Sequence, residues 1–173
     1  MPMPLACSKS GAATTLELQT ERRTDLFRIR SARRLDAEAI RGLLQELGYA
    51  EGADAATLHW VISHPEMEIF VATDSRDRAI GMISLSHRPQ LRMRGRIATI
   101  DELVVTERWR GRGVGRELLK RAVARAKVLS VRRLEVVSHA ARSDVARHFY
   151  ESNGFSEADS MVFRFSELDF TTH

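Results

Sequence analysis

Glycines and arginines crowd one short stretch of the chain, RGRGVG at residues 110–115, directly ahead of a helical pattern. Apolar residues then recur three or four positions apart as far as Ala126, which is typical of one buried helix face. At a helix N-terminus, unpaired N–H groups carry a partial positive charge, and glycine lets an anion approach the backbone closely. Arg110, Arg112 and Arg116 would add full positive charges. The stretch therefore predicts a phosphate-binding loop.

This loop does not follow either of the better-known phosphate motifs. It lacks the lysine followed by serine or threonine of a P-loop, and no acidic residue closes a strand about twenty residues later, as a dinucleotide fold requires. A plainer interpretation is that the glycines form a turn and the arginines a solvated face. The loop alone leaves both interpretations open.

Two adjacent carboxylates, Asp101 and Glu102, interrupt the apolar segment IATIDELVV, which is expected to form a strand over residues 97–105. Carboxylates in a buried strand are costly unless they are paired or used in function. Since neighbouring side chains of a strand point to opposite faces, we expect one to pair with an arginine and the other to face a cleft. Glu102 is the candidate catalytic base, and structural ion pairing is the alternative.

The elements that must position these groups follow from periodicity, caps and breakers. Strands are expected at residues 26–30, 68–73, 79–86, 97–105, 133–138, 155–158 and 161–168, with a basic loop at 88–96. Helices are expected from a cap at Asp36 to a stop at Gly48, over 53–63 with a cap near Asp54, from the glycine run to 129, and over 144–152. The pattern predicts an α/β chain with a mixed sheet.

Three segments together resemble the GNAT N-acetyltransferase superfamily: IDELVV, RGRGVG and FYESNGF, the last at residues 149–155. The family's loop pattern is Arg or Gln, two residues, Gly, one residue, then Gly or Ala, and Arg110, Gly113 and Gly115 match it. The resemblance covers about residues 27–168. It implies the acyl-CoA N-acyltransferase fold, an α+β arrangement in which a central mixed sheet of about seven strands is flanked by helices.

The resemblance also implies acetyl-coenzyme A as cosubstrate, with no metal, bound where the central strand and the next strand splay apart. The backbone at Leu103, Val104 and Val105 would pair with the pantetheine arm. The pyrophosphate would lie on the amides from Arg110 to Arg116, a run that contains Gly111, Arg112, Gly113, Val114 and Gly115. Ser143 occupies a position where family members often carry an asparagine that touches the cofactor. Tyr150 would protonate the departing thiolate, and a core aromatic role is its alternative.

The expected activity is acetyl transfer to a primary amine by direct attack in a ternary complex, with Glu102 as base. The acceptor is left open between a small amine, an amino acid, an antibiotic and a protein. A non-catalytic acyl-coenzyme A sensor is one alternative. A homodimer is common in the resembled family.

Charge leaves one further alternative. Between residues 88 and 133 there are twelve Arg and two Lys against four Asp and Glu, an excess that favours a polyanionic partner. Coenzyme A would serve, and so would nucleic acid. Only Trp109 interleaves the basic residues and no recognition-helix motif is present, so nucleic acid is the less favoured partner.

Length and composition indicate one domain over residues 26–173, preceded by a flexible extension at 1–25 that is rich in Ser, Thr, Ala and Pro. No secretory signal or membrane-spanning run is found. The single cysteine, Cys7, cannot form an internal disulfide, so we expect a reducing cytoplasm and neither a zinc site nor a cysteine nucleophile.

Overall fold

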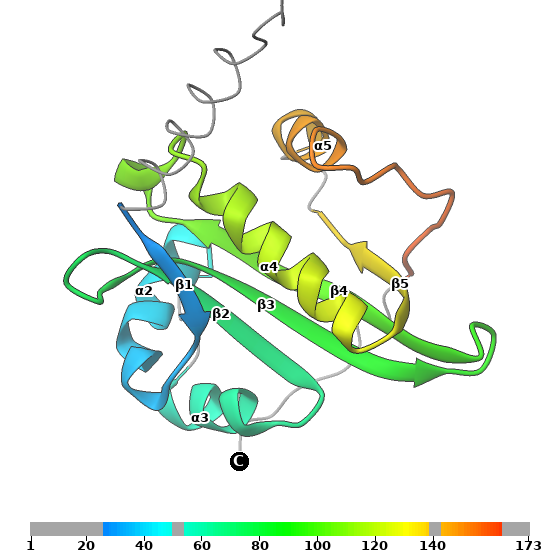
Figure 1. Cartoon of the computed structure of the whole chain (residues 1–173), viewed down its shortest axis with the longest axis horizontal. Coiled ribbons are helices and arrows are strands. Elements are labelled where there is room, and N and C mark those ends of the chain that lie inside the picture. The colour runs from blue at the N-terminus through cyan, green and yellow to red at the C-terminus, as the bar shows by residue number, and fades with distance from the viewer. Residues whose placement is uncertain (1–25, 50–53, 139–142, 164–173) are drawn as a thin grey trace, which may run out of the picture. The chain divides into compact units, whose positions relative to one another are not determined.

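The computed structural model describes residues 26–49, 54–138 and 143–163 (Figure 1). The expected extension at 1–25 lies outside these residues. Contacts divide the chain into one unit that ends at Val137 and a second that begins at Ser138. Each unit is described by itself.

The first unit contains a mixed sheet in the order β1-β2-β3-β4-β5. Its strands are β1 (Arg28–Ser31), β2 (Met67–Thr73), β3 (Ala79–Gln90), β4 (Gly95–Val105) and β5 (Val131–Val136). The first four strands pair antiparallel, and β5 pairs parallel to β4. The helices of this unit are η1 (Arg34–Asp36), α2 (Ala37–Leu47), α3 (Ala55–Ser63), η2 (Glu107–Trp109) and α4 (Val114–Val128). The expected α/β class with a mixed sheet is confirmed.

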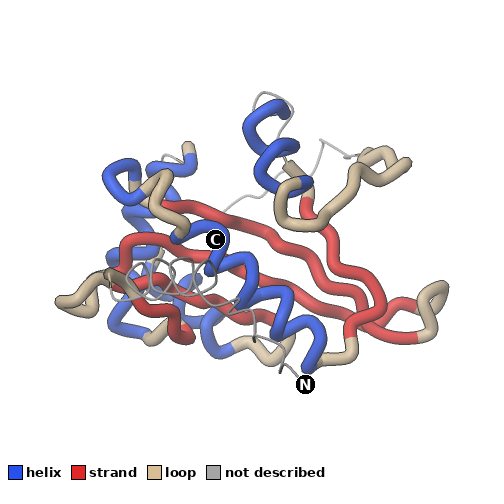
Figure 2. The backbone as a smooth tube through the Cα atoms, turned by 45° about the horizontal axis from the view of Figure 1, so that its top comes forward, coloured by secondary structure: helices blue, strands red, loops and turns tan. Residues whose placement is uncertain are grey.

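Helices cover both faces of this sheet. On one face, α2 and α3 pack against the strands through a buried apolar cluster: Ile40, Leu43, Leu44, Leu58, Ile69, Val71, Met82 and Val104. Phe70 alternates with Val71 and so faces the other way, where the guanidinium of Arg121 on α4 lies 4.8 Å from its ring centroid. Figure 2 shows α4 lying over this face of the sheet. The sheet is therefore buried on both sides over its middle.

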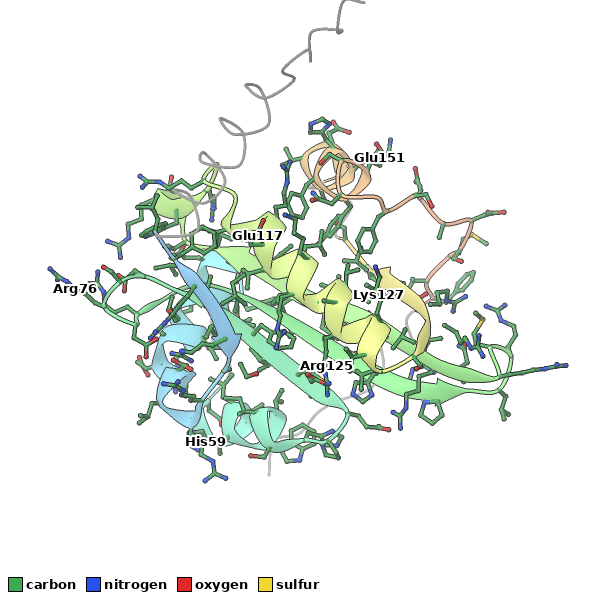
Figure 3. The ribbon with its side chains drawn as sticks, in the orientation of Figure 1. His59, Arg76, Glu117, Arg125, Lys127 and Glu151 are labelled. Atoms are coloured by element: carbon green, nitrogen blue, oxygen red, sulfur yellow. The ribbon has the colours of Figure 1, made fainter. Side chains whose placement is uncertain are left out.

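Ion pairs link the helices to the strands. Arg125 on α4 donates to Glu68 on β2 at 2.6 Å, and Figure 3 shows Arg125 on the side of the helix that meets the sheet. Asp36, expected to cap α2 with its side chain, instead accepts from both Arg30 nitrogens at 2.7 and 2.9 Å and from the Arg33 N–H at 2.7 Å. This side chain makes no cap bond to α2, because its oxygens are already engaged by arginine.

Other helix ends follow the sequence. Asp54 caps α3 by accepting from the Thr57 N–H at 2.7 Å. Gly48 ends α2 in the left-handed conformation, with φ 108°. In the second unit, α5 (Ser143–Glu151) begins one residue earlier than expected and is followed by Gly154 at φ 86°.

Two expectations about strands are wrong. The expected basic loop at 88–96 is mostly strand, because antiparallel pairing continues out to Gln90 and Gly95 and leaves a turn of only four residues. Residues 155–158 form no strand, and neither do 161–163, whose apolar side chains are exposed rather than packed on a neighbour. The rest of the expected strand at 161–168 lies outside the described residues. The described part of the chain thus holds five strands where about seven were expected.

Candidate functional site

The edge of β4 beyond Ile100 is open. Pairing with β5 runs only from Arg96 to Ile100, so within the described residues Asp101–Val105 have no strand partner on that side. The Thr106 N–H donates to the Ile80 carbonyl on β3 at 2.9 Å, and alternation along the strand then turns the backbone groups of Leu103 and Val105 toward the open edge. Such an edge offers unpaired N–H and C=O groups to an extended ligand.

The three predicted pantetheine residues are therefore not equivalent. Leu103 and Val105 direct backbone groups outward, whereas Val104 directs its own toward β3 and buries its side chain beside Met82 in the cluster under α2 and α3. Val105 O already accepts a hydrogen bond from Arg110 Nε at 2.9 Å. One carbonyl lone pair of Val105 remains for a ligand.

The predicted phosphate loop does lead into a helix. Gly111 and Gly113 have φ values of 72° and 86°, a left-handed conformation that side chains with a Cβ rarely adopt, and Gly113 is the N-cap of α4. The N–H groups of the next three residues, Val114, Gly115 and Arg116, are then without intrahelical acceptors. A Cβ placed on Gly111 would meet nothing within 4 Å, so the space next to the Gly111 backbone is open.

The arginines of the loop are arranged differently from one another. Arg110, Arg112 and Arg116 are all exposed. The Arg112 guanidinium lies 5.2 Å from the ring centroid of Trp109, a cation–π distance that orders it beside the loop. Arg110 is held by Val105 O, and its Nη2 lies 3.8 Å from Glu46 Oε2. Positive charge is thereby gathered at the start of α4.

Glu46, near the end of α2, binds the segment that leads into the loop. Its carboxylate accepts from Thr106 Oγ1 at 2.7 Å and from the Glu107 N–H at 3.1 Å. An open pocket of about 490 Å³ is lined by Glu46, Thr106, Glu107, Arg108 and Arg110. Sequence reasoning missed Glu46, because it lies on an ordinary helix surface sixty residues before Thr106.

Asp101 and Glu102 face the same side of the sheet, and the expectation of opposite faces is wrong. Ile83 pairs with Leu103 and Leu85 with Ile100, so two residues of β4 oppose the single residue Ser84. This is a β-bulge, and it breaks the alternation on which the expectation depended. Both carboxylates therefore face the side of the sheet that α2 and α3 cover further along.

Each carboxylate is bound by a serine of β3. Ser84 Oγ donates to Glu102 Oε2 and accepts from the Glu102 N–H at 2.9 Å. Ser86 Oγ donates to Asp101 Oδ1 at 3.1 Å. The expected pairing with arginine is not seen for either carboxylate in the described residues. The two serines were not predicted, although their spacing of two along a strand indicates one shared face.

Partial burial affects both carboxyls, although the Asp101 residue keeps an exposed surface. Burial raises the pKa of the Glu102 carboxyl above its ordinary value; the Ser84 hydroxyl opposes that rise, and the negative charge of Asp101 adds to it. Burial likewise raises the pKa of Asp101, against the hydrogen bonds from Ser86. A carboxylate with a raised pKa is a stronger base, which favours Glu102 as a proton acceptor.

The second unit carries the other two predicted residues. Ser143 is the first residue of α5, and Tyr150 lies in its last turn. The Tyr150 ring makes edge contacts with Phe149 and Phe155, at centroid distances of 5.2 and 5.7 Å. Burial raises the pKa of its phenol above the ordinary value of 10.0. Burial therefore favours the protonated phenol, which is the form that could donate a proton.

The described residues lack two further classes of structure. No helix there is long and apolar enough to cross a membrane. No group of three or more His, Cys, Asp and Glu side chains there is arranged to hold a metal ion.

Comparisons with known proteins give the family and the fold of this chain. The model of the acetyltransferase (GNAT) family matches residues 29–155. A putative acetyltransferase from Agrobacterium tumefaciens has a similar structure, with 27% identity, a TM-score of 0.71, and coverage of 81% of this chain and 99% of that one. No curated protein matches the chain significantly.

Two further solved structures share the fold at lower identity. An aminoglycoside acetyltransferase from an uncultured soil sample, in complex with sisomicin, is 16% identical with a TM-score of 0.69, over 82% of this chain and 97% of that one. A transcriptional regulator from Bacillus halodurans is 24% identical with a TM-score of 0.73, over 81% and 99%. At these identities the likeness concerns the fold alone.

Proposed function

Because the chain belongs to the acetyltransferase (GNAT) family, we propose that it transfers the acetyl group of acetyl-coenzyme A to a primary amine. The observation that carries the proposal is the continuity of an open β4 edge with a glycine loop at the start of α4. The edge offers hydrogen bonds to an amide-containing arm, and the loop offers N–H groups and arginines to a pyrophosphate. Ser143 would add a cofactor contact from α5.

Acetyl-coenzyme A would supply an activated acetyl group as its thioester. The chain's own residues would hold it: Leu103 and Val105 by backbone hydrogen bonds, and the run from Arg110 to Arg116 by its amides and guanidinium groups. The side chain of Val104 is buried in the core, so this residue would help to bind the cofactor only by holding β4 in place. Open space before Gly111 supports a close approach of phosphate to the backbone.

Two side chains would handle protons. Amines are mostly protonated at pH 7, and Glu102, whose pKa is raised by burial, would remove the proton directly or through water. Tyr150 would donate its phenolic proton to the departing sulfur, and its raised pKa keeps that proton in place. No residue is asked to form a covalent intermediate, so direct attack in a ternary complex is the expected route.

The acceptor's amine would meet the face of the sheet that carries Asp101 and Glu102. We include a cytoplasmic location in the proposal, since one cysteine in the chain suits a reducing compartment. A homodimer is also proposed, and light scattering in solution would test it.

Release of free thiol tests the proposed reaction. The protein is mixed with acetyl-coenzyme A and a panel of amines, amino acids, aminoglycosides and peptides, and thiol is followed with a chromogenic disulfide. We expect release that requires both an acceptor and the protein, with a matching mass gain of one acetyl group on the acceptor. Binding of acetyl-coenzyme A without thiol release for any acceptor class would instead indicate a sensing domain.

A further inference from the structure

The β3–β4 hairpin ends in a group of arginines that the proposed function does not use. This arginine tip consists of Arg88, Arg92, Arg94 and Arg96 on the hairpin and Arg132 and Arg133 at the start of β5. Residues 88–96 contain four arginines and no Asp or Glu. Pairing brings β5 alongside, because Arg96 pairs with Val131 and Ile97 with Arg133. The arginine excess seen in the sequence is thus divided between the arginine tip and the phosphate loop at residues 110–116.

The arginine tip and the phosphate loop lie at opposite ends of β4, as Figure 1 shows for the β3–β4 turn and the start of α4. β4 runs from Gly95 to Val105, eleven residues. At about 3.3 Å per residue the strand spans roughly 35 Å. An anion held by the amides of residues 110–116 therefore leaves the arginine tip without a counter-charge.

Most of these arginines are free to bind. Arg88, Arg92, Arg94 and Arg132 are exposed and have no ion-pair partner among the described residues. Arg96 Nη1 lies 3.0 Å from His87 Nδ1, a neutral or like-charged neighbour. Arg133 Nε lies 3.0 Å from Glu135 Oε2, without hydrogen-bond geometry. The six guanidinium groups of the tip thus have one carboxylate, that of Glu135, as an ion-pair partner among the described residues. Leu91, at the apex of the hairpin, is 97% exposed.

We propose that the arginine tip is a docking site for duplex nucleic acid. A guanidinium group can bind one phosphate through two parallel hydrogen bonds, and every basic residue of the tip is arginine rather than lysine. Beyond the Arg96–Val131 pair, no third strand of the described residues accompanies the β3–β4 hairpin. The width of such a two-stranded antiparallel ribbon suits the major groove of a duplex, so neither a recognition helix nor interleaved aromatic residues are required. An exposed leucine at the apex can make an apolar contact with the methyl group that thymine presents in the major groove.

An anionic lipid surface is the other partner with suitable charge. Segments that bind at a membrane interface commonly add tryptophan or tyrosine at the headgroup level. Residues 88–96 contain no aromatic residue. The observations therefore favour phosphates presented along a groove over phosphates presented on a flat surface.

Fluorescence anisotropy with a labelled DNA duplex of about 20 base pairs tests the proposal on the full chain. Each phosphate contact contributes about −0.9 to the slope of log affinity against log salt concentration, so four to six contacts predict a slope between about −3.6 and about −5.4. Arg88→Glu with Arg92→Glu should weaken binding at least tenfold and reduce the magnitude of the slope by about two. Arg88→Gln with Arg92→Gln should reduce the slope equally without adding repulsion, and it keeps the test valid if the glutamate variant folds poorly.

The matched control is Arg34→Glu with Arg76→Glu, which changes the net charge by the same amount elsewhere; Figure 3 shows Arg76 at the β2–β3 turn. Equal weakening by this control would mean attraction by net charge and would overturn the proposal. So would loss of DNA binding in Arg112→Glu with Arg116→Glu but not in the tip variants. Tip-dependent binding to vesicles containing phosphatidylserine, with no binding to the duplex, would identify a membrane instead. The thermal shift caused by acetyl-coenzyme A is measured in parallel, and the tip variants should retain it.

Discussion

Ser84 on β3 and Glu102 on β4 are joined by two hydrogen bonds across the bulge. Ser84 Oγ accepts from the Glu102 N–H at 2.9 Å and donates to the Glu102 carboxylate. The serine is 1% exposed, so water cannot readily replace it. The hydrogen bond from the Glu102 N–H orients the Ser84 hydroxyl, and that hydroxyl in turn orients the Glu102 carboxylate. Ser84 is therefore a positioning residue for the proposed base.

Ser84→Ala is therefore expected to lower kcat about tenfold, with little change in the KM for acetyl-coenzyme A. The Ser84 hydroxyl lowers the pKa of Glu102, so its removal should move the acidic limb of the pH profile of kcat/KM to higher pH. Ser86→Ala, which removes the corresponding bond to Asp101, is the matched control and should leave that limb in place. An unchanged limb in Ser84→Ala would show that the serine acts only in folding.

Glu102→Gln should lower kcat by about a hundredfold or more at pH 7, within the usual range for a general base, and abolish the acidic limb. The same substitution should lower activity but raise stability. Because the pKa of Glu102 is raised in the folded protein, the stability linked to this group is present at low pH and is lost as pH rises through the folded pKa. Glutamine removes that loss, so the variant should melt at a higher temperature than wild type at pH 8 and differ little at pH 4. A lower melting temperature for Glu102→Gln than for wild type at pH 8 would contradict a raised pKa of Glu102 in the folded protein.

Tyr150→Phe keeps the ring contacts with Phe149 and Phe155 and removes only the hydroxyl. Turnover should fall by roughly ten- to a thousandfold, with little change in acetyl-coenzyme A affinity or melting temperature. The chain contains one other tyrosine, Tyr49, which is 56% exposed, and Tyr49→Phe is the control for the same chemical change. Full activity in Tyr150→Phe would transfer the acid role to water or another side chain.

Asp36→Asn should destabilise the first unit by about 3 kcal/mol, because it leaves the largely buried Arg30 guanidinium partly unpaired. Burial alone would raise the pKa of Asp36, but hydrogen bonds from Arg30 and from the Arg33 N–H outweigh it and lower the pKa. The contribution of Asp36 is therefore complete above its unfolded pKa and is lost as pH falls through the folded value.

Urea unfolding from pH 7 to pH 2 checks this expectation. The stability gap between wild type and Asp36→Asn should narrow below about pH 4. Asp77→Asn provides a comparison, since Asp77 also pairs with Arg30 but is 36% exposed, and arginines lower its pKa to about 2. A gap that stays constant over the whole range would show that the loss comes from packing rather than charge.

Local patterns predicted the parts of the site that are local in the chain. Gly113 at the N-cap of α4, the cap at Asp54 and the helix end at Gly48 each depend on residues within one helical turn, so periodicity and turn chemistry were sufficient. The resemblance added the proposed roles of Leu103 and Tyr150, which no spacing argument supplies and which stay predictions.

What failed depends on pairing between distant residues. The faces of Asp101 and Glu102 were mispredicted because a bulge is set by the register with β3, eighteen residues before Glu102. Glu46 carries no signal of its own and gains significance only where α2 meets Thr106. The extent of the β3–β4 hairpin was underestimated because arginines on a two-stranded ribbon look like a solvated loop.

Calorimetric titration of acetyl-coenzyme A into the wild-type protein and into Gly113→Asp tests the central claim most directly. The aspartate would add a side chain and a negative charge at the head of α4, where phosphate is proposed to bind. Gly113→Asn adds nearly the same shape without charge, and Gly48→Asn imposes a similar left-handed strain at the end of α2. We predict saturable binding to wild type and to Gly48→Asn, weaker binding to Gly113→Asn, and none measurable to folded Gly113→Asp. No heat with wild type, or equal affinity in folded Gly113→Asp, would contradict the proposed cofactor site.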